Sequence, residues 1–166
     1  MPEQSTVFSQ VLKHKGFFNF SELYAFCFWW FREEQYNVTE KLYQEKLNAA
    51  GKEIVIEWEA WKKISDYFKQ KIKVKWHILG LNDAEVEVDG KKVKTNKGEL
   101  KLTVDGILER DYEETWEKSP TNKFLRGIYD KYIIKTTIDE YEDRLFLKAN
   151  SFFEDTKAFL ALEGKK

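Results

Sequence analysis

The stretch that decides the fold is Phe68-Lys69-Gln70-Lys71-Ile72-Lys73-Val74-Lys75-Trp76-His77-Ile78. Gln70 apart, one set of alternate positions is apolar, and the other set carries four lysines and a histidine. Successive side chains of a β-strand point to opposite faces, so this alternation predicts a strand with one buried and one solvated face. Such one-sided burial is typical of antiparallel sheets.

The same period of two appears on both sides of this stretch. The further segments that alternate in this way are residues 53–60, 84–88, 93–95 and 99–108. The pair Asp89-Gly90 is typical of a tight hairpin turn, and Asn96-Lys97-Gly98 marks another turn. Strands joined by short turns predict an antiparallel meander rather than a parallel sheet.

Charge varies between these strands in a regular way. The expected outward residues are glutamates in segment 53–60 (Glu53, Glu57, Glu59), lysines in the quoted stretch, and glutamates again at Glu85 and Glu87. This pattern predicts a lysine strand between two glutamate strands, since opposite charges across neighbouring strands stabilise a sheet. A basic stripe that binds RNA or an acidic partner is the other interpretation. The net charge of −1 and the lack of aromatic residues among the lysines make nucleic acid the less favoured partner.

Helix signals stand before and after the strands. Asn19 with Glu22 predicts a helix over residues 20–34, and Asn37 with Glu40 predicts a second helix over about 37–49. Ser119-Pro120 predicts a helix over 120–134, and Thr137 with Glu140 predicts one over 138–162. Residues 1–18 are expected to form an N-terminal arm, and residues 19–166 a single domain. The predicted fold class is α+β, in which N-terminal and C-terminal helices pack on one face of an antiparallel four- to five-stranded meander sheet.

Few residues are suited to catalysis or metal binding. The chain has two histidines and one cysteine, Cys27, and it has neither a glycine-rich phosphate loop nor a Gly-x-Ser-x-Gly turn. We therefore expect a protein that is not an enzyme and has no cofactor and no bound metal. A single cysteine and no signal peptide predict a cytoplasmic location, and the longest apolar run, residues 23–31, is too short for a transmembrane segment.

That apolar run is the second notable feature of the sequence. As a helix it is apolar on all sides, so one sheet cannot cover it. The later helices, a second subunit or partner protein, or an apolar ligand or lipid surface could cover the rest.

We predict a non-catalytic interaction or scaffold protein. It would self-associate, giving an oligomer in solution, or dock a partner through Phe28, Trp29, Trp30 and Phe31, because aromatic residues dominate interface energetics. The alternative is a carrier of a small apolar ligand or lipid, in a cavity between the sheet and the C-terminal helix. The residues expected to line that cavity are Trp58, Trp76, Phe152 and Phe159.

Several stretches together resemble a family of small conserved proteins from DPANN-group archaea. They are Ile64-Ser65-Asp66-Tyr67-Phe68-Lys69, Lys73-Val74-Lys75-Trp76, Lys123-Phe124-Leu125-Arg126-Gly127-Ile128-Tyr129-Asp130-Lys131-Tyr132-Ile133-Ile134, Ile138-Asp139-Glu140-Tyr141-Glu142 and Lys157-Ala158-Phe159-Leu160-Ala161-Leu162-Glu163-Gly164-Lys165. The resemblance extends from about residue 20 onward. It implies a cytoplasmic archaeal protein and transfers no catalytic residue.

Overall fold

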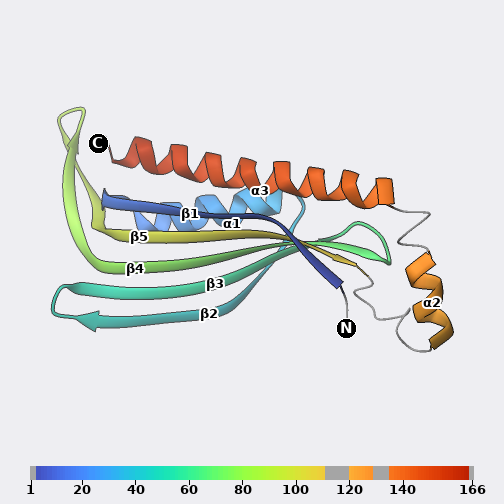
Figure 1. Cartoon of the computed structure of the whole chain (residues 1–166). Helices are drawn as coiled ribbons and strands as arrows, with labels where there is room; N and C mark the ends of the chain where they lie inside the picture. Colours follow the sequence, from blue (N-terminus) through green and yellow to red (C-terminus); the bar gives the residue numbers. More distant parts are fainter. Residues whose placement is uncertain (1–2, 111–119, 129–134, 165–166) are drawn as a thin grey trace.

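A computed structural model gives the fold and describes residues 3–110, 120–128 and 135–164 (Figure 1). Strands and helices follow one another as β1 (Glu3–Phe17), α1 (Phe20–Glu33), β2 (Asn37–Asn48), β3 (Gly51–Lys63), β4 (Phe68–Val88), β5 (Lys91–Arg110), α2 (Pro120–Ile128) and α3 (Lys135–Glu163). The fold is α+β, as the sequence predicts.

The strands form one five-stranded sheet in the order β1-β5-β4-β3-β2, and all neighbours are antiparallel. Strands β2 to β5 make the expected meander. Strand β1 pairs with β5 at one edge, and α1 carries the chain across the sheet to β2 at the other edge (Figure 1).

The helices α1 and α3 lie on one face of the sheet, while α2 lies beyond its end (Figure 1). We call the opposite face, which carries the lysines of β4, the outward face. The core lies between the sheet and these two helices. Its largest side chains with almost no exposed surface include Trp76, Tyr36, Phe18, Phe31 and Phe152. Each such burial stabilises the fold by about 1.5–3 kcal/mol.

The predicted N-terminal arm is instead strand β1. Residues 3–17 pair with β5 from Glu3–Arg110 to Phe17–Lys97, and a bulge lies between Thr6 and Phe8. Phe8 and Leu12 are buried in the core. Val7 packs against the core from a half-buried position, and the other side chains of the strand stay outside it, so the sequence shows little alternation. The pairing with β5 determines its conformation.

The helix predicted over residues 37–49 is wrong, because this segment is strand β2. Lys, Glu, Leu and Gln dominate it, and these residues favour helices when packing does not decide. Pairing with β3 overrides that preference along the whole strand, from Asn37–Trp61 to Asn48–Gly51. Ala49 and Ala50 form the turn, and Gly51 follows with a φ of 129°.

The short segments 84–88 and 93–95 are the far ends of β4 and β5 rather than separate strands. No turn separates residues 68–78 from 84–88. The chain instead bends at a bulge between Leu79 and Asn82, where Gly80 has a φ of 60°. Glu85 and Glu87 therefore lie on the lysine strand itself and pair with Lys94 and Lys92 of β5.

The predicted charge pairing is accordingly half right. Glutamates of β3 lie opposite lysines of β4, in the pairs Glu57–Lys75 and Glu59–Lys73. On the other side the acids come from β5 rather than from Glu85 and Glu87. Its pairs with β4 include Asp105–Lys73 and Glu109–Lys69.

Two predicted helices match the structure closely. Helix α1 begins after Asn19, whose Oδ1 accepts a hydrogen bond of 3.0 Å from the backbone N–H of Glu22. Helix α3 begins a turn earlier than predicted, at Lys135, and an ion pair joins Glu140 to Arg144 one turn further along it. Helix α2 covers the first part of the range predicted for it, and residues 129–134 lie outside the described residues.

Candidate functional site

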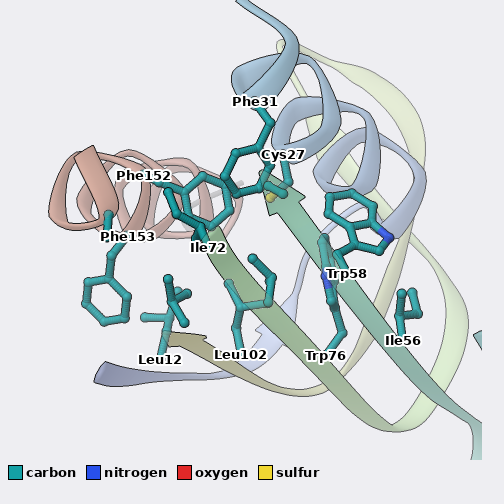
Figure 2. Close-up of a cluster of buried hydrophobic side chains, with 14 of the residues drawn as sticks. Leu12, Cys27, Phe31, Ile56, Trp58, Ile72, Trp76, Leu102, Phe152 and Phe153 are labelled. Atoms are coloured by element: carbon teal, nitrogen blue, oxygen red, sulfur yellow. The ribbon is translucent and has the colours of Figure 1, made fainter. Parts of the chain in front are cut away.

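The aromatic helix α1 is covered on two sides. Leu23, Cys27 and Phe31 repeat every four residues, lie on one stripe and are fully buried. Figure 2 shows Cys27 and Phe31 pointing into the cluster of buried side chains between the helices and the sheet. This stripe anchors α1 in the core.

Helix α3 covers the flank of α1 that carries Trp30. The Phe31 ring stacks on Phe152 with ring centroids 4.4 Å apart, and Trp30 lies edge-on to Phe152 at 5.1 Å. The Trp30 indole N–H donates a hydrogen bond of 2.9 Å to Asp155. Part of the cover that the aromatic helix requires therefore comes from α3.

The other flank of α1 faces β2 and is only partly covered. Tyr24 and Phe28 of α1 are half-buried there, and Tyr24 packs edge-on against Trp58 at 4.9 Å. Trp29 lies beside Phe28 at 5.3 Å, and 59% of its surface is exposed. Tyr43 of β2 is also exposed. We call the surface made by Tyr24, Phe28, Trp29 and Tyr43 the aromatic ledge.

A carboxylate ties the ledge to the sheet. Glu40 of β2 accepts a hydrogen bond from the Tyr24 hydroxyl and another of 2.9 Å from the indole N–H of Trp58. Burial, then the contact with Glu40 and, least, the nearby Tyr43 raise the pKa of Tyr24 to about 12. Glu40 itself stays exposed, so it can accept further hydrogen bonds from a bound molecule.

The four residues predicted for an interface thus have different surroundings. Phe31 is buried, Trp30 packs on α3, Phe28 is half-buried within the ledge, and Trp29 is exposed. Of the four, Trp29 is best placed to contact another molecule. Sequence reasoning missed Glu40 and Tyr43, because their segment reads as a helix. The one local signal for a strand is the turn Ala49-Ala50-Gly51 just before an alternating segment.

Each of the four residues predicted to line a ligand cavity packs against another aromatic ring. Trp58 and Trp76 pack edge-on at 5.2 Å near α1, and both are buried (Figure 2). Phe152 stacks on Phe31, and Phe159 stacks on Phe26 at 4.9 Å. The surface hollows of the sheet and of α3 are lined by other side chains, and Trp76, Phe152 and Phe159 are not among them.

A second candidate region is a basic hollow near the start of α3. It has a volume of about 540 Å³, and its lining includes Lys62, Lys63, Arg144 and Lys148. Its cations are already engaged, since Lys148 pairs with Glu34 and Arg144 with Glu140. Lys62 donates to the backbone carbonyl of Glu34. The aromatic ledge is therefore the better candidate for a binding surface.

Comparisons with known proteins add no family assignment: no family model, curated protein or solved structure matches this chain. The resemblance to an archaeal family stays a prediction. Within the described ranges, no three His, Cys, Asp or Glu side chains gather as a metal site requires. None of the helices in those ranges combines the length and apolarity that crossing a bilayer needs.

Proposed function

We propose that this protein is a non-catalytic interaction domain. In this proposal, an extended segment of a partner protein adds to the open edge of β2 and rests its side chains on the aromatic ledge. Strand addition at a sheet edge is a common mode of peptide recognition, in which backbone hydrogen bonds give affinity and side-chain contacts give specificity. Two observations carry the proposal: Trp29, next to Phe28 on α1, is exposed, and β2 is at one edge of the sheet.

The regular half of β2, residues 42–48, is the segment best suited to pairing. A bulge lies between Glu40 and Leu42, and bulges and lysines commonly protect edge strands from unwanted pairing. Beyond the bulge the strand is regular as far as Asn48. Leu47, at 82% exposed, extends the apolar surface of the ledge along this half.

Charge indicates the chemistry of the partner. Glu40 and Glu45 lie on the helix side of β2, next to the tyrosines of the ledge. Aromatic faces and carboxylates together favour cationic side chains. We therefore propose a partner strand that alternates Lys or Arg with apolar residues on the side that faces the ledge.

A second copy of β2 is a poorer occupant. In an antiparallel pair of β2 strands centred on Tyr43, opposite charges would face each other along the sequence. Glu40 would lie opposite Lys46, and Lys41 opposite Glu45. However, Glu40 lies on the helix side, whereas Lys46 pairs with Glu53 on the outward face. Directly opposite residues of an antiparallel pair share a face, so this match cannot form.

The test is selection of extended peptides from a random library displayed against the intact protein. We expect selected peptides to alternate cationic and apolar residues and to slow amide hydrogen exchange in residues 42–48. Trp29→Ser should weaken binding about tenfold or more, as expected for an interface aromatic. Phe124→Ser is the matched control, because Phe124 of α2 is an aromatic residue of similar exposure, 68% against 59% for Trp29, and lies outside the ledge.

Two results would contradict the proposal. One is protection from exchange that falls outside β2 and α1. The other is equal loss of peptide binding in Trp29→Ser and Phe124→Ser. Native mass spectrometry tests whether the bound molecule is a second copy of this chain. If the wild type is an oligomer that Trp29→Ser dissociates, the ledge binds a second copy and not a foreign partner.

A further inference from the structure

One row of side chains on the outward face breaks the pattern of paired acids and bases. The strand register sets Lys13 of β1 opposite Lys101 of β5, and Lys101 opposite His77 of β4. Like charges that lie directly opposite each other across strands are destabilising. We call these three residues the lysine row.

Neighbouring rows of the same face show the usual arrangement. Lys15 forms an ion pair of 3.3 Å with Glu99, and Lys75 one of 3.9 Å with Glu57. The half-buried Lys71 lies between two carboxylates, those of Glu59 and Glu109. The outward face therefore neutralises its lysines in the rows on either side.

The lysine row lacks such neutralisation. In the part of the chain that the structure describes, Lys13 and Lys101 have no ion-pair partner, and both are exposed. The third member, His77, has its Nε2 3.3 Å from Glu53 and adds positive charge only when protonated. The unbalanced charge thus belongs mainly to the two lysines.

A hollow of about 440 Å³ lies at this row. Three lysines and one glutamate line it, namely Lys13, Lys15, Lys101 and Glu99, so the formal lining charge is 3 − 1 = +2 with histidine neutral. Leu79, which is 41% exposed, forms an apolar part of the wall. The hollow combines excess positive charge with a small apolar surface.

We infer that the lysine row binds the phosphate group of a small organic phosphate monoester. Such a group carries a charge of about −1.5 to −2 at neutral pH, which matches the excess positive charge of the hollow. Lysine binds phosphate as a point charge without strict geometry, as suits flexible side chains from neighbouring strands. Leu79 provides a surface for the organic part of the ligand.

The same features disfavour a nucleic-acid strand as the ligand. A strand needs a continuous basic groove with aromatic side chains on which its bases stack. Here the adjacent rows are neutralised by their own acids, so the lysine row does not continue into a basic groove.

Thermal unfolding of the intact protein in phosphate and in chloride, at equal ionic strength and pH, tests this inference. The key variant is Lys101→Gln. It removes the central charge of the row, so it should raise the unfolding midpoint in chloride by about 1–3 °C. Inorganic phosphate and pyrophosphate should stabilise the wild type and bind Lys101→Gln at least tenfold more weakly in calorimetric titrations.

Lys73→Gln is the matched control. Lys73 is also an exposed lysine of the outward face, but it lies opposite Glu59 and Asp105. Its replacement should lower the midpoint in chloride and leave pyrophosphate binding unchanged. Equal pyrophosphate binding by wild type and Lys101→Gln would overturn the inference. So would binding of a single-stranded RNA 20-mer that is tighter than pyrophosphate binding and depends on Lys101.

Discussion

At the scale of single residues, Tyr24 is the most informative side chain of the ledge. Burial and the contact with Glu40 raise its pKa to about 12, above the ordinary value of 10.0. The folded state therefore holds the phenol proton more tightly than the unfolded chain does. The stability that this provides is fully present below pH 10 and is lost as the pH rises from 10 toward 12.

This linkage gives a pH-dependent prediction. The free energy of unfolding of the wild type should fall between pH 10 and 12, and it should fall less in Tyr24→Phe. Glu40→Gln removes the neighbouring carboxylate, so it should move the Tyr24 transition to lower pH. Urea unfolding at a series of pH values, with tyrosinate absorbance followed in parallel, measures both effects. The same pH dependence in wild type and Tyr24→Phe would rule out the predicted role of this tyrosine.

Residue identity alone predicts part of this site. An aromatic helix capped by Asn19 is evident from the sequence, because capping and apolar composition are local properties. Which of its rings stays exposed is not evident, since Phe31 and Trp29 are both large and apolar. The position of α3, which stacks Phe152 on Phe31, decides between them, and that is a long-range property.

At the scale of elements, β2 shows where local patterns mislead. Its composition is that of an exposed helix, and its side chains are mostly exposed in the strand as well. Burial therefore gives little period-two signal, and backbone pairing with β3 decides the conformation. In contrast, β4 buries alternate residues from Phe68 to Ile78, so its alternation predicts the strand correctly.

The turn between β2 and β3 is held by close contact with the bend of β4. The Asn82 side chain donates a hydrogen bond of 2.8 Å to the carbonyl of Ala50. A Cβ atom on Gly51 would lie 2.8 Å from that side chain and 2.9 Å from the backbone carbon of Gly80. The turn and the bend therefore fit together only with glycine at position 51.

Gly51→Ala should destabilise the protein by about 2–3 kcal/mol, because it adds both a clash and an unfavourable φ. Gly90→Ala is the control. Gly90 also has a positive φ, 78°, but open space surrounds its Cβ position, so we expect a cost of about 1 kcal/mol. Urea denaturation of both variants measures the difference. Equal costs would show that the contact with Asn82 and Gly80 contributes nothing to stability.

At the scale of the whole molecule, the charge pattern on the outward face predicts the neighbour of β4 on one side and misses its neighbour on the other. Opposite charges place β3 beside β4, as the structure confirms. They do not predict that β4 continues through the bend at Gly80, or that β5 rather than residues 84–88 is its other neighbour. The bulge between Leu79 and Asn82 interrupts the alternation, so residues 68–78 and 84–88 look like two strands in the sequence although both belong to β4.

The N-terminal strand contacts both the sheet and helix α3. Strand β1 pairs with β5 along its whole length, and Phe8 packs edge-on against Phe146 and Phe153 of α3. Gly106 of β5 lies under the same contact, because a Cβ there would be 3.3 Å from Phe8 and 3.2 Å from Ala149. Without β1, one edge of β5 and part of α3 would lose their cover.

Removal of residues 1–18 should therefore abolish cooperative folding rather than leave a stable domain of residues 19–166. Loss of Phe8 and Leu12 alone removes about 3–6 kcal/mol of apolar burial, comparable to the 5–15 kcal/mol by which a typical domain is stable. The measurement is near-ultraviolet circular dichroism of the truncated chain during urea unfolding, and we expect no cooperative transition. A synthetic peptide of residues 1–18, added in excess, should restore the transition by pairing with β5, and a peptide with Phe8 and Leu12 both changed to Ser should not. A truncated chain that unfolds cooperatively on its own would show that α1, α3 and the remaining strands form a sufficient core, and that β1 is after all an accessory arm.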